Sequence, residues 1–146
     1  MKKIISVFLF LVLVIGALTG CTLTNRLSNA LEENAESTPK IEEMLSALIE
    51  NRASDAKALF HPDVTDNTDA AIAQMIDYID GREISSMELD GININTSIGT
   101  SGKIREESLS YLILMTDGEI LRINALYVSG NDKSGFATFQ VVLGVV

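Results

Sequence analysis

The chain has 146 residues, of which 20 are acidic, 11 are lysine or arginine and one is histidine, so its formal net charge is −9 at pH 7. A strongly acidic chain without tryptophan argues against nucleic-acid binding, which draws on clustered lysine and arginine to release counterions. One cysteine and one histidine leave neither an internal disulfide framework nor a zinc site built from these residue types.

The first 20 residues have the parts of a secretory signal peptide. Lys2 and Lys3 form a short basic start, and the apolar run Ile4–Ala17 follows it. The run ends in Leu18-Thr19-Gly20-Cys21, which resembles the lipobox of bacterial lipoproteins. That resemblance implies lipid attachment to the Cys21 thiol, cleavage before Cys21, and a domain anchored in the cell envelope outside the cytoplasm. Two or three acyl chains are enough for stable membrane anchoring.

An uncleaved membrane helix is the alternative interpretation, because Ile4–Leu23 reaches the roughly 20 residues that span a bilayer. Both interpretations tether the remaining chain outside the cytoplasm. Cleavage before Cys21 would remove Lys2 and Lys3 and leave 20 acidic and 9 basic side chains, a net charge of −11. Such a charge argues against a second, electrostatic contact with anionic lipid.

A polar stretch and three predicted helices follow the cysteine. Residues 22–37 are acidic and poor in large apolar groups, so we expect a flexible tether there and one folded domain over residues 38–146. Thr38 as N-cap and Pro39 at the first helical position predict the start of the first helix. Its apolar stripe is Ile41, Met44, Leu45, Leu48 and Ile49.

Two further helices are predicted, and the first of them is short. Ser54 is predicted to cap a helix over residues 55–60, which Pro62 prevents from continuing. A third helix is predicted over residues 69–80, with Gly81 in the position of a left-handed C-terminal cap.

After Gly81 the apolar period changes to two, which predicts strands. We expect four strands joined by short links, and therefore an antiparallel meander. Helices followed by strands predict an α+β fold, with three N-terminal helices packed on one face of a curved four-stranded sheet. The predicted strands are residues 84–94, 103–116, 119–128 and 136–146.

This order of elements resembles the nuclear transport factor 2-like (cystatin-like) cone fold, and more narrowly small bacterial lipoproteins of unknown function built on it. The segments that carry the resemblance are SDAKALFHPDV (54–64), IDYIDG (76–81), LILMTDGEILRINALYV (112–128) and SGFATFQVV (134–142). The resemblance implies either a ligand- or partner-binding domain or, as in some relatives, a dehydratase or isomerase that uses histidine and aspartate inside the cone.

His61 is the single histidine, and aspartates follow it at positions 63, 66 and 69. A histidine with an orienting carboxylate can act as a general base. Alternatively, His61 ends the second helix, where a partly cationic ring suits the helix dipole, and the aspartates solvate the next loop and cap the third helix. The aspartates lack the alternating spacing of a calcium loop, and no phosphate- or dinucleotide-binding motif occurs. We therefore predict no catalytic residue, no metal site and no cofactor.

The third strand separates two kinds of side chain. Its more apolar face carries Leu121, Ile123, Ala125 and Tyr127 and is expected to meet the helices, while Arg122, Asn124 and Leu126 point outward. At Asp117-Gly118 a two-residue loop would turn Leu112 and Leu114 inward, whereas a three-residue loop with left-handed Gly118 would turn Tyr111, Ile113 and Met115 inward. In either register we expect no carboxylate or imidazole on the inner face of these two strands.

The leading prediction is a non-catalytic, lipid-anchored extracytoplasmic domain that binds either an apolar small ligand or another envelope protein. A cone-fold enzyme using His61 with an aspartate and a structural envelope lipoprotein without a ligand are the alternatives. Apolar residues left on the outer face predict a contact there. A homodimer or a docked partner would use Arg122, Asn124 and Leu126.

Overall fold

The computed structural model describes residues 35–64, 67–79, 81–100 and 102–143, all within one compact unit that spans residues 35–146. The predicted signal peptide, the lipobox and residues 22–34 of the tether lie outside the described residues. No described helix has both the length and the apolar composition that crossing a bilayer requires.

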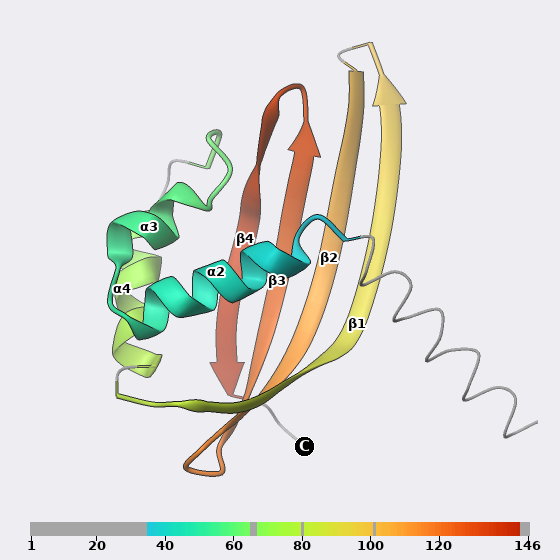
Figure 1. Cartoon of the computed structure of the whole chain (residues 1–146). Helices are drawn as coiled ribbons and strands as arrows, with labels where there is room; N and C mark the ends of the chain where they lie inside the picture. Colours follow the sequence, from blue (N-terminus) through green and yellow to red (C-terminus); the bar gives the residue numbers. More distant parts are fainter. Residues whose placement is uncertain (1–34, 65–66, 80, 101, 144–146) are drawn as a thin grey trace, which may run out of the picture. The chain divides into compact units, whose positions relative to one another are not determined.

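Three helices precede four strands, as the sequence predicts. The helices are α2 (Thr38–Ile49), α3 (Ala53–Ala58) and α4 (Thr68–Ile79). The strands are β1 (Ile84–Gly99), β2 (Gly102–Met115), β3 (Ile120–Gly130) and β4 (Lys133–Leu143). They pair in the order β1-β2-β3-β4, all antiparallel, in a sheet that does not close (Figure 1). The predicted α+β fold with a four-stranded antiparallel meander is therefore confirmed.

The core lies between one face of the sheet and the helices. Helix α2 crosses this inner face, and α3 and α4 lie toward β4 (Figure 1). Burial on the inner face comes from alternate residues of the strands, because successive side chains in a strand point to opposite sides. The largest fully buried apolar side chains are Ile41, Met44, Leu48, Ile72, Tyr111, Ile113, Met115, Leu121, Ile123 and Phe136.

The helix ends differ from the prediction by one or two residues. Ser37, not Thr38, is the N-cap of α2, and Pro39 follows in the first turn. Helix α3 begins at Ala53 after Arg52, so Ser54 is not its cap. Gly81 has φ +69°, which confirms the left-handed end of α4.

The second helix also ends earlier than predicted, because Phe60 has another partner. Phe60 forms a one-residue parallel bridge with Phe136 of β4. The Phe136 amide donates to the Leu59 carbonyl at 2.9 Å, and the His61 amide donates to the Phe136 carbonyl at 3.0 Å. These two hydrogen bonds pair backbone groups of Leu59 and His61 that would pair within α3 if the helix continued.

The hairpin between β2 and β3 has the three-residue register. Ile113 pairs with Leu121, the Met115 amide donates to the Glu119 carbonyl at 2.9 Å, and Gly118 has φ +87°. Tyr111, Ile113 and Met115 are accordingly buried on the inner face, together with Leu121 and Ile123.

The other two links are shorter than predicted, and the strands correspondingly longer. β3 and β4 join through Asn131 and Asp132, which have φ +52° and +61°. Positive φ at both central residues is the signature of a two-residue type I′ turn, whose twist matches that of the flanking strands. Strand β1 reaches Gly99 and contains two register shifts, the second of which makes Asp90 an extra residue opposite β2.

The prediction that the inner face of β2 and β3 carries no carboxylate is wrong, because Glu107 lies there and is only 1% exposed. Its carboxylate accepts hydrogen bonds from the Ser37 hydroxyl at 2.5 Å, the Ser37 amide at 2.9 Å and the Glu36 amide at 3.1 Å. The Arg105 Nε donates to it at 2.6 Å. Glu107 thus satisfies donors at the start of α2 that the helix itself cannot pair.

The folded unit begins earlier than residue 38. Ala35 is 8% exposed and Ser37 is fully buried. Residues 35–37, which the sequence analysis assigned to the tether, therefore pack in the domain, since Glu107 pairs their polar groups.

Candidate functional site

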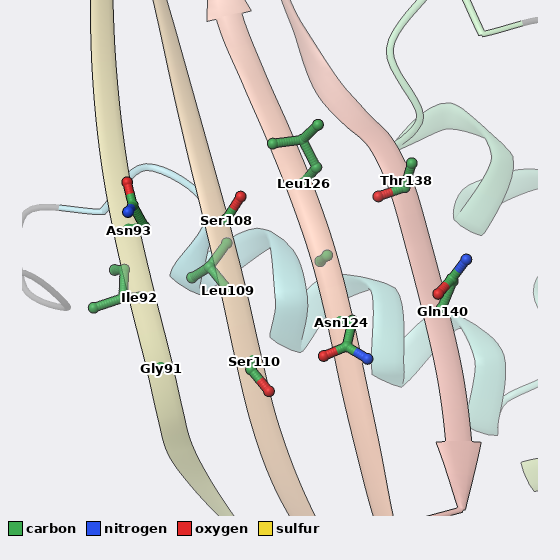
Figure 2. Close-up of a pocket in the computed structure, with 11 residues that line it drawn as sticks. Gly91, Ile92, Asn93, Ser108, Leu109, Ser110, Asn124, Leu126, Thr138 and Gln140 are labelled. Carbon is green, nitrogen blue, oxygen red and sulfur yellow. The ribbon is translucent and has the colours of Figure 1, made fainter.

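The outer face of the sheet, which no described helix covers, contains a hollow of about 500 Å³ (Figure 2). Its polar side chains come from all four strands and carry no formal charge: they are Asn93, Ser108, Ser110, Asn124, Thr138 and Gln140. Leu126 is the apolar outward side chain among them, and Gly91 supplies bare backbone at one side.

Strand register explains why these side chains meet. Ser110 of β2 lies opposite Asn124 of β3, which in turn lies opposite Gln140 of β4. In the neighbouring outward row, Leu126 has Ser108 on one side and Thr138 on the other. The hollow is therefore lined by two adjacent rows of carboxamides and hydroxyls, which donate and accept hydrogen bonds equally well.

Arg122 borders this hollow and has partners within the chain. Its Nη1 contacts the Asp90 carboxylate and donates to the Ser110 hydroxyl at 3.1 Å. Because Asp90 is the extra residue of the β1 bulge, the bulge delivers this carboxylate to the outer face. The Arg122 side chain is 32% exposed, so it keeps some contact with solvent.

Arg122, Asn124 and Leu126 share the outer face of β3, as the sequence predicts. The apolar side chains expected around them do not form one contiguous patch. Leu112, Leu114 and Ile120 gather near the hairpin between β2 and β3, and the row of Ser110 and Asn124 separates them from Leu126. The outer face thus offers a mostly polar hollow that contains Leu126, and a separate apolar group near the hairpin.

His61 lies away from this face and is not at the end of a helix. Its side chain is 14% exposed, and its Nδ1 accepts from the Asp63 amide at 3.3 Å. The Asp63 carboxylate is 3.8 Å from that nitrogen but is bound by Lys133 Nζ at 2.8 Å. The hydrogen bond and the charge of Lys133 lower the pKa of Asp63.

Of the three aspartates that follow His61 in the sequence, only Asp63 is placed beside it among the described residues. Asp69 pairs with Lys57 at 2.7 Å, and Asp66 lies outside the described residues. Over the same part of the chain, no group of three or more His, Cys, Asp or Glu side chains is arranged to hold a metal ion.

Glu107 is the buried carboxylate that the sequence analysis missed. Burial alone would raise its pKa, but the hydrogen bonds from Ser37, Glu36 and Arg105 outweigh that effect and hold the pKa below its usual value of 4.5. A carboxylate kept ionised by four donors is a poor proton acceptor. The adjacent pair Glu106-Glu107 was the signal, because in a strand one of two neighbours must face inward.

Comparison of the chain with protein-family models, with curated proteins and with solved structures finds no match.

Proposed function

We propose that this chain is a lipid-anchored, extracytoplasmic binding domain without catalytic activity, and that its partner docks on the outer face of the sheet. The observation that carries the proposal is the hollow of neutral hydrogen-bonding side chains around Asn124, which no described helix covers. The opposite face is filled by the helices and the core, so the outer face is the broad surface left for recognition.

The polar lining of the hollow suits a protein or another hydrated partner better than an apolar ligand. Polar rims and buried central side chains are typical of protein interfaces, and Leu126 supplies an apolar centre here. Glu88, Asp90 and Glu106 lie on the β1–β2 side of the same face, and Arg122 balances only the second of them. We therefore infer a partner that presents basic side chains toward this margin.

The anchor in the proposal is Cys21, on the strength of Leu18-Thr19-Gly20-Cys21 after the apolar run. We further infer that the fold is a nuclear transport factor 2-like cone, which the order of three helices and a curved antiparallel sheet supports. The proposal includes no catalytic activity because the Asp63 carboxylate is bound by Lys133 and the Glu107 carboxylate is bound by the start of α2.

Radiolabelled palmitate added to bacteria that express the full chain tests the anchor. The unmodified chain should take up label and appear in the membrane fraction. Cys21→Ala should stay unlabelled as a heavier precursor, while Thr24→Ala, outside the lipobox, should behave like the unmodified chain. Normal processing of Cys21→Ala would refute lipidation.

A photo-crosslinking amino acid at position 124 tests the docking face, with the same amino acid at exposed position 43 of α2 as control. Cross-links that form at 124, fail at 43 and disappear with Leu126→Glu would support docking; equal cross-linking at both positions would refute it. Sedimentation of the mature chain with Cys21→Ser tests for self-association. A micromolar monomer unchanged by Leu126→Glu would exclude a homodimer.

A further inference from the structure

Strand β4 has a free edge along half of its length. β3 pairs with one side of β4, and the bridge between Phe60 and Phe136 covers the start of the other side. From Thr138 to Leu143, that second side has no strand partner among the described residues. The backbone amides and carbonyls that point to this side are available for pairing.

The chemistry of this edge is unusual for an unprotected strand. Strand β4 has one register shift, at Ala137, and beyond it residues 138–143 read TFQVVL, without a charge, a proline or a further shift. Val142 and Leu143 are 40% and 56% exposed. Natural edge strands are normally blunted by charges, prolines or bulges, because an open edge recruits other strands. The opposite edge of the sheet follows that rule, since β1 carries Glu88, Asp90 and two register shifts.

A second hollow, of about 530 Å³, lies between helix α4 and this edge. Helix α4 contributes Ala71, Gln74, Met75 and Tyr78, and β4 contributes its residues 139–143. No charged side chain lines the hollow. The Tyr78 hydroxyl is buried and has no hydrogen-bond partner among the described residues, which is rare for a buried polar group.

We propose that the free edge of β4 and this hollow together bind an extended segment of another protein by strand addition. Six residues of β4 give room for a strand of about 20 Å. Main-chain hydrogen bonds would supply affinity, and alternate side chains of the added strand would enter the hollow against α4. The apolar lining selects apolar residues at those alternate positions.

The negative charge of this chain favours basic residues at both ends of the bound segment and disfavours binding of a second copy of the chain. The mature chain has a net charge of −11, so another copy would bring the same charge to the edge. A segment bordered by lysine or arginine is attracted instead. This site does not depend on the outer-face hollow, and it would stand if docking at Asn124 failed.

The test uses the mature chain with Cys21→Ser and an acetylated heptapeptide of alternating valine and threonine with lysine at each end. Titration followed by NMR should show saturable binding, and hydrogen exchange should slow at alternate amides of residues 138–143. The same peptide with methylated backbone nitrogens at alternate positions should bind at least tenfold more weakly, because it cannot complete the ladder.

Helix α4 offers a matched pair of variants, since Ala71 and Ala73 are both exposed and lie on opposite flanks of the helix. Ala71→Trp fills the hollow and should weaken peptide binding at least tenfold, whereas Ala73→Trp should stay within threefold. Leu126→Glu on the outer face should leave peptide binding unchanged. A glutamate-ended peptide should bind several-fold more weakly, by a margin that shrinks as salt is added.

Several results would overturn the proposal. These are no binding at millimolar peptide, equal binding of the methylated peptide, or exchange protection outside β4. Equal effects of the two tryptophan variants would likewise place the peptide elsewhere, and equal binding of the glutamate-ended peptide would remove the charge argument. A concentration-dependent dimer that Ala71→Trp abolishes would assign the edge to a second copy. The methylated-peptide comparison needs no variant, so it decides the matter even if Ala71→Trp fails to fold.

Discussion

Replacement of Glu107 by glutamine should destabilise the domain at its N-terminal boundary. The carboxylate accepts from the amides of Glu36 and Ser37, from the Ser37 hydroxyl and from Arg105. A carboxamide keeps one acceptor oxygen but turns its NH₂ toward two of these donors, because each carboxylate oxygen accepts from two of them. A buried donor left without an acceptor costs about 1–3 kcal/mol.

In either orientation one of the two donors is a fixed backbone amide, at about 1–3 kcal/mol, and the other is a side chain that can turn away, at about 1 kcal/mol, which together predict a loss of about 2–4 kcal/mol in the free energy of unfolding. Arg105 adds little to that loss, because its side chain is 23% exposed and can turn to water. For a domain of this size each kcal/mol lowers the melting temperature by roughly 4 °C, so Glu107→Gln should melt about 8–16 °C below the unmodified chain.

Glu106→Gln is the matched control, because Glu106 is the exposed neighbour on the outer face of the same strand. Thermal and urea unfolding of both variants measure the difference. Amide exchange at Ser37 and Ile41 should accelerate only in Glu107→Gln, since the Ile41 amide donates to the Ser37 carbonyl. A Glu107→Gln domain within 0.5 kcal/mol of the control would refute the assigned role.

The pH dependence follows from the sign of the pKa shift. The pKa of Glu107 is lower in the folded chain than its usual 4.5, so its ionised form stabilises the fold. That contribution is fully present above the usual pKa and is lost as the pH falls through the lowered folded value. The stability gap between the unmodified chain and Glu107→Gln should therefore be constant near neutrality and narrow below about pH 4.5.

Three further substitutions and one control, Gly99→Ala, test the turns and the bridge by thermal unfolding. Gly118→Ala should lower the free energy of unfolding by about 1–2 kcal/mol, because the φ of Gly118 is +87°. Gly99→Ala, where a Cβ meets open space, should lower it by less than about 0.5 kcal/mol. Equal losses in the two variants would contradict this reasoning. Gly135→Ala should cost more, about 2–4 kcal/mol, because its Cβ would lie 2.5 Å from the His61 nitrogen; a mild effect would mean that the bridge yields easily. His61→Gln should cost less than about 1 kcal/mol and leave any binding intact, since the His61 backbone forms the bridge; a folded variant without function would refute this.

The helices and the sheet were predictable because their apolar periods are strong and their boundaries are marked. Ile72, Met75, Ile76 and Ile79 form one stripe, and Gly81 ends it in the left-handed conformation. The meander followed from short links alone. The apolar period did not predict the hairpin register at Asp117-Gly118, because a two-residue loop and a three-residue loop both place apolar side chains of β2 on the inner face.

The predicted strand ends were wrong where a residue type that is typical of turns serves another purpose in the fold. The predicted strands left residues 129–135 as a long link, but two glycines in it serve close approaches: a Cβ on Gly130 would lie 2.5 Å from the Lys103 carbonyl, and Gly135 faces His61. The turn itself uses Asn131 and Asp132 at positive φ. Neither the bulge at Asp90 nor its contact with Arg122 has a signature in the apolar pattern, so the edges of the outer hollow became visible only in the fold.

Glu107 also bears on how an anchored domain would withstand a pull along its chain. The groups it holds, on Glu36 and Ser37, are where the chain enters the folded unit, so a force applied there reaches β2 directly through charge-assisted hydrogen bonds. Strand β2 is paired on both sides, with β1 and with β3, and cannot leave the sheet without breaking two ladders. Without this carboxylate the same force would act on the first turn of α2, whose amides lack helical partners. The position of the buried charge thus suits a domain tethered from its N-terminus, and the stability it adds lies at the point where the tether would begin.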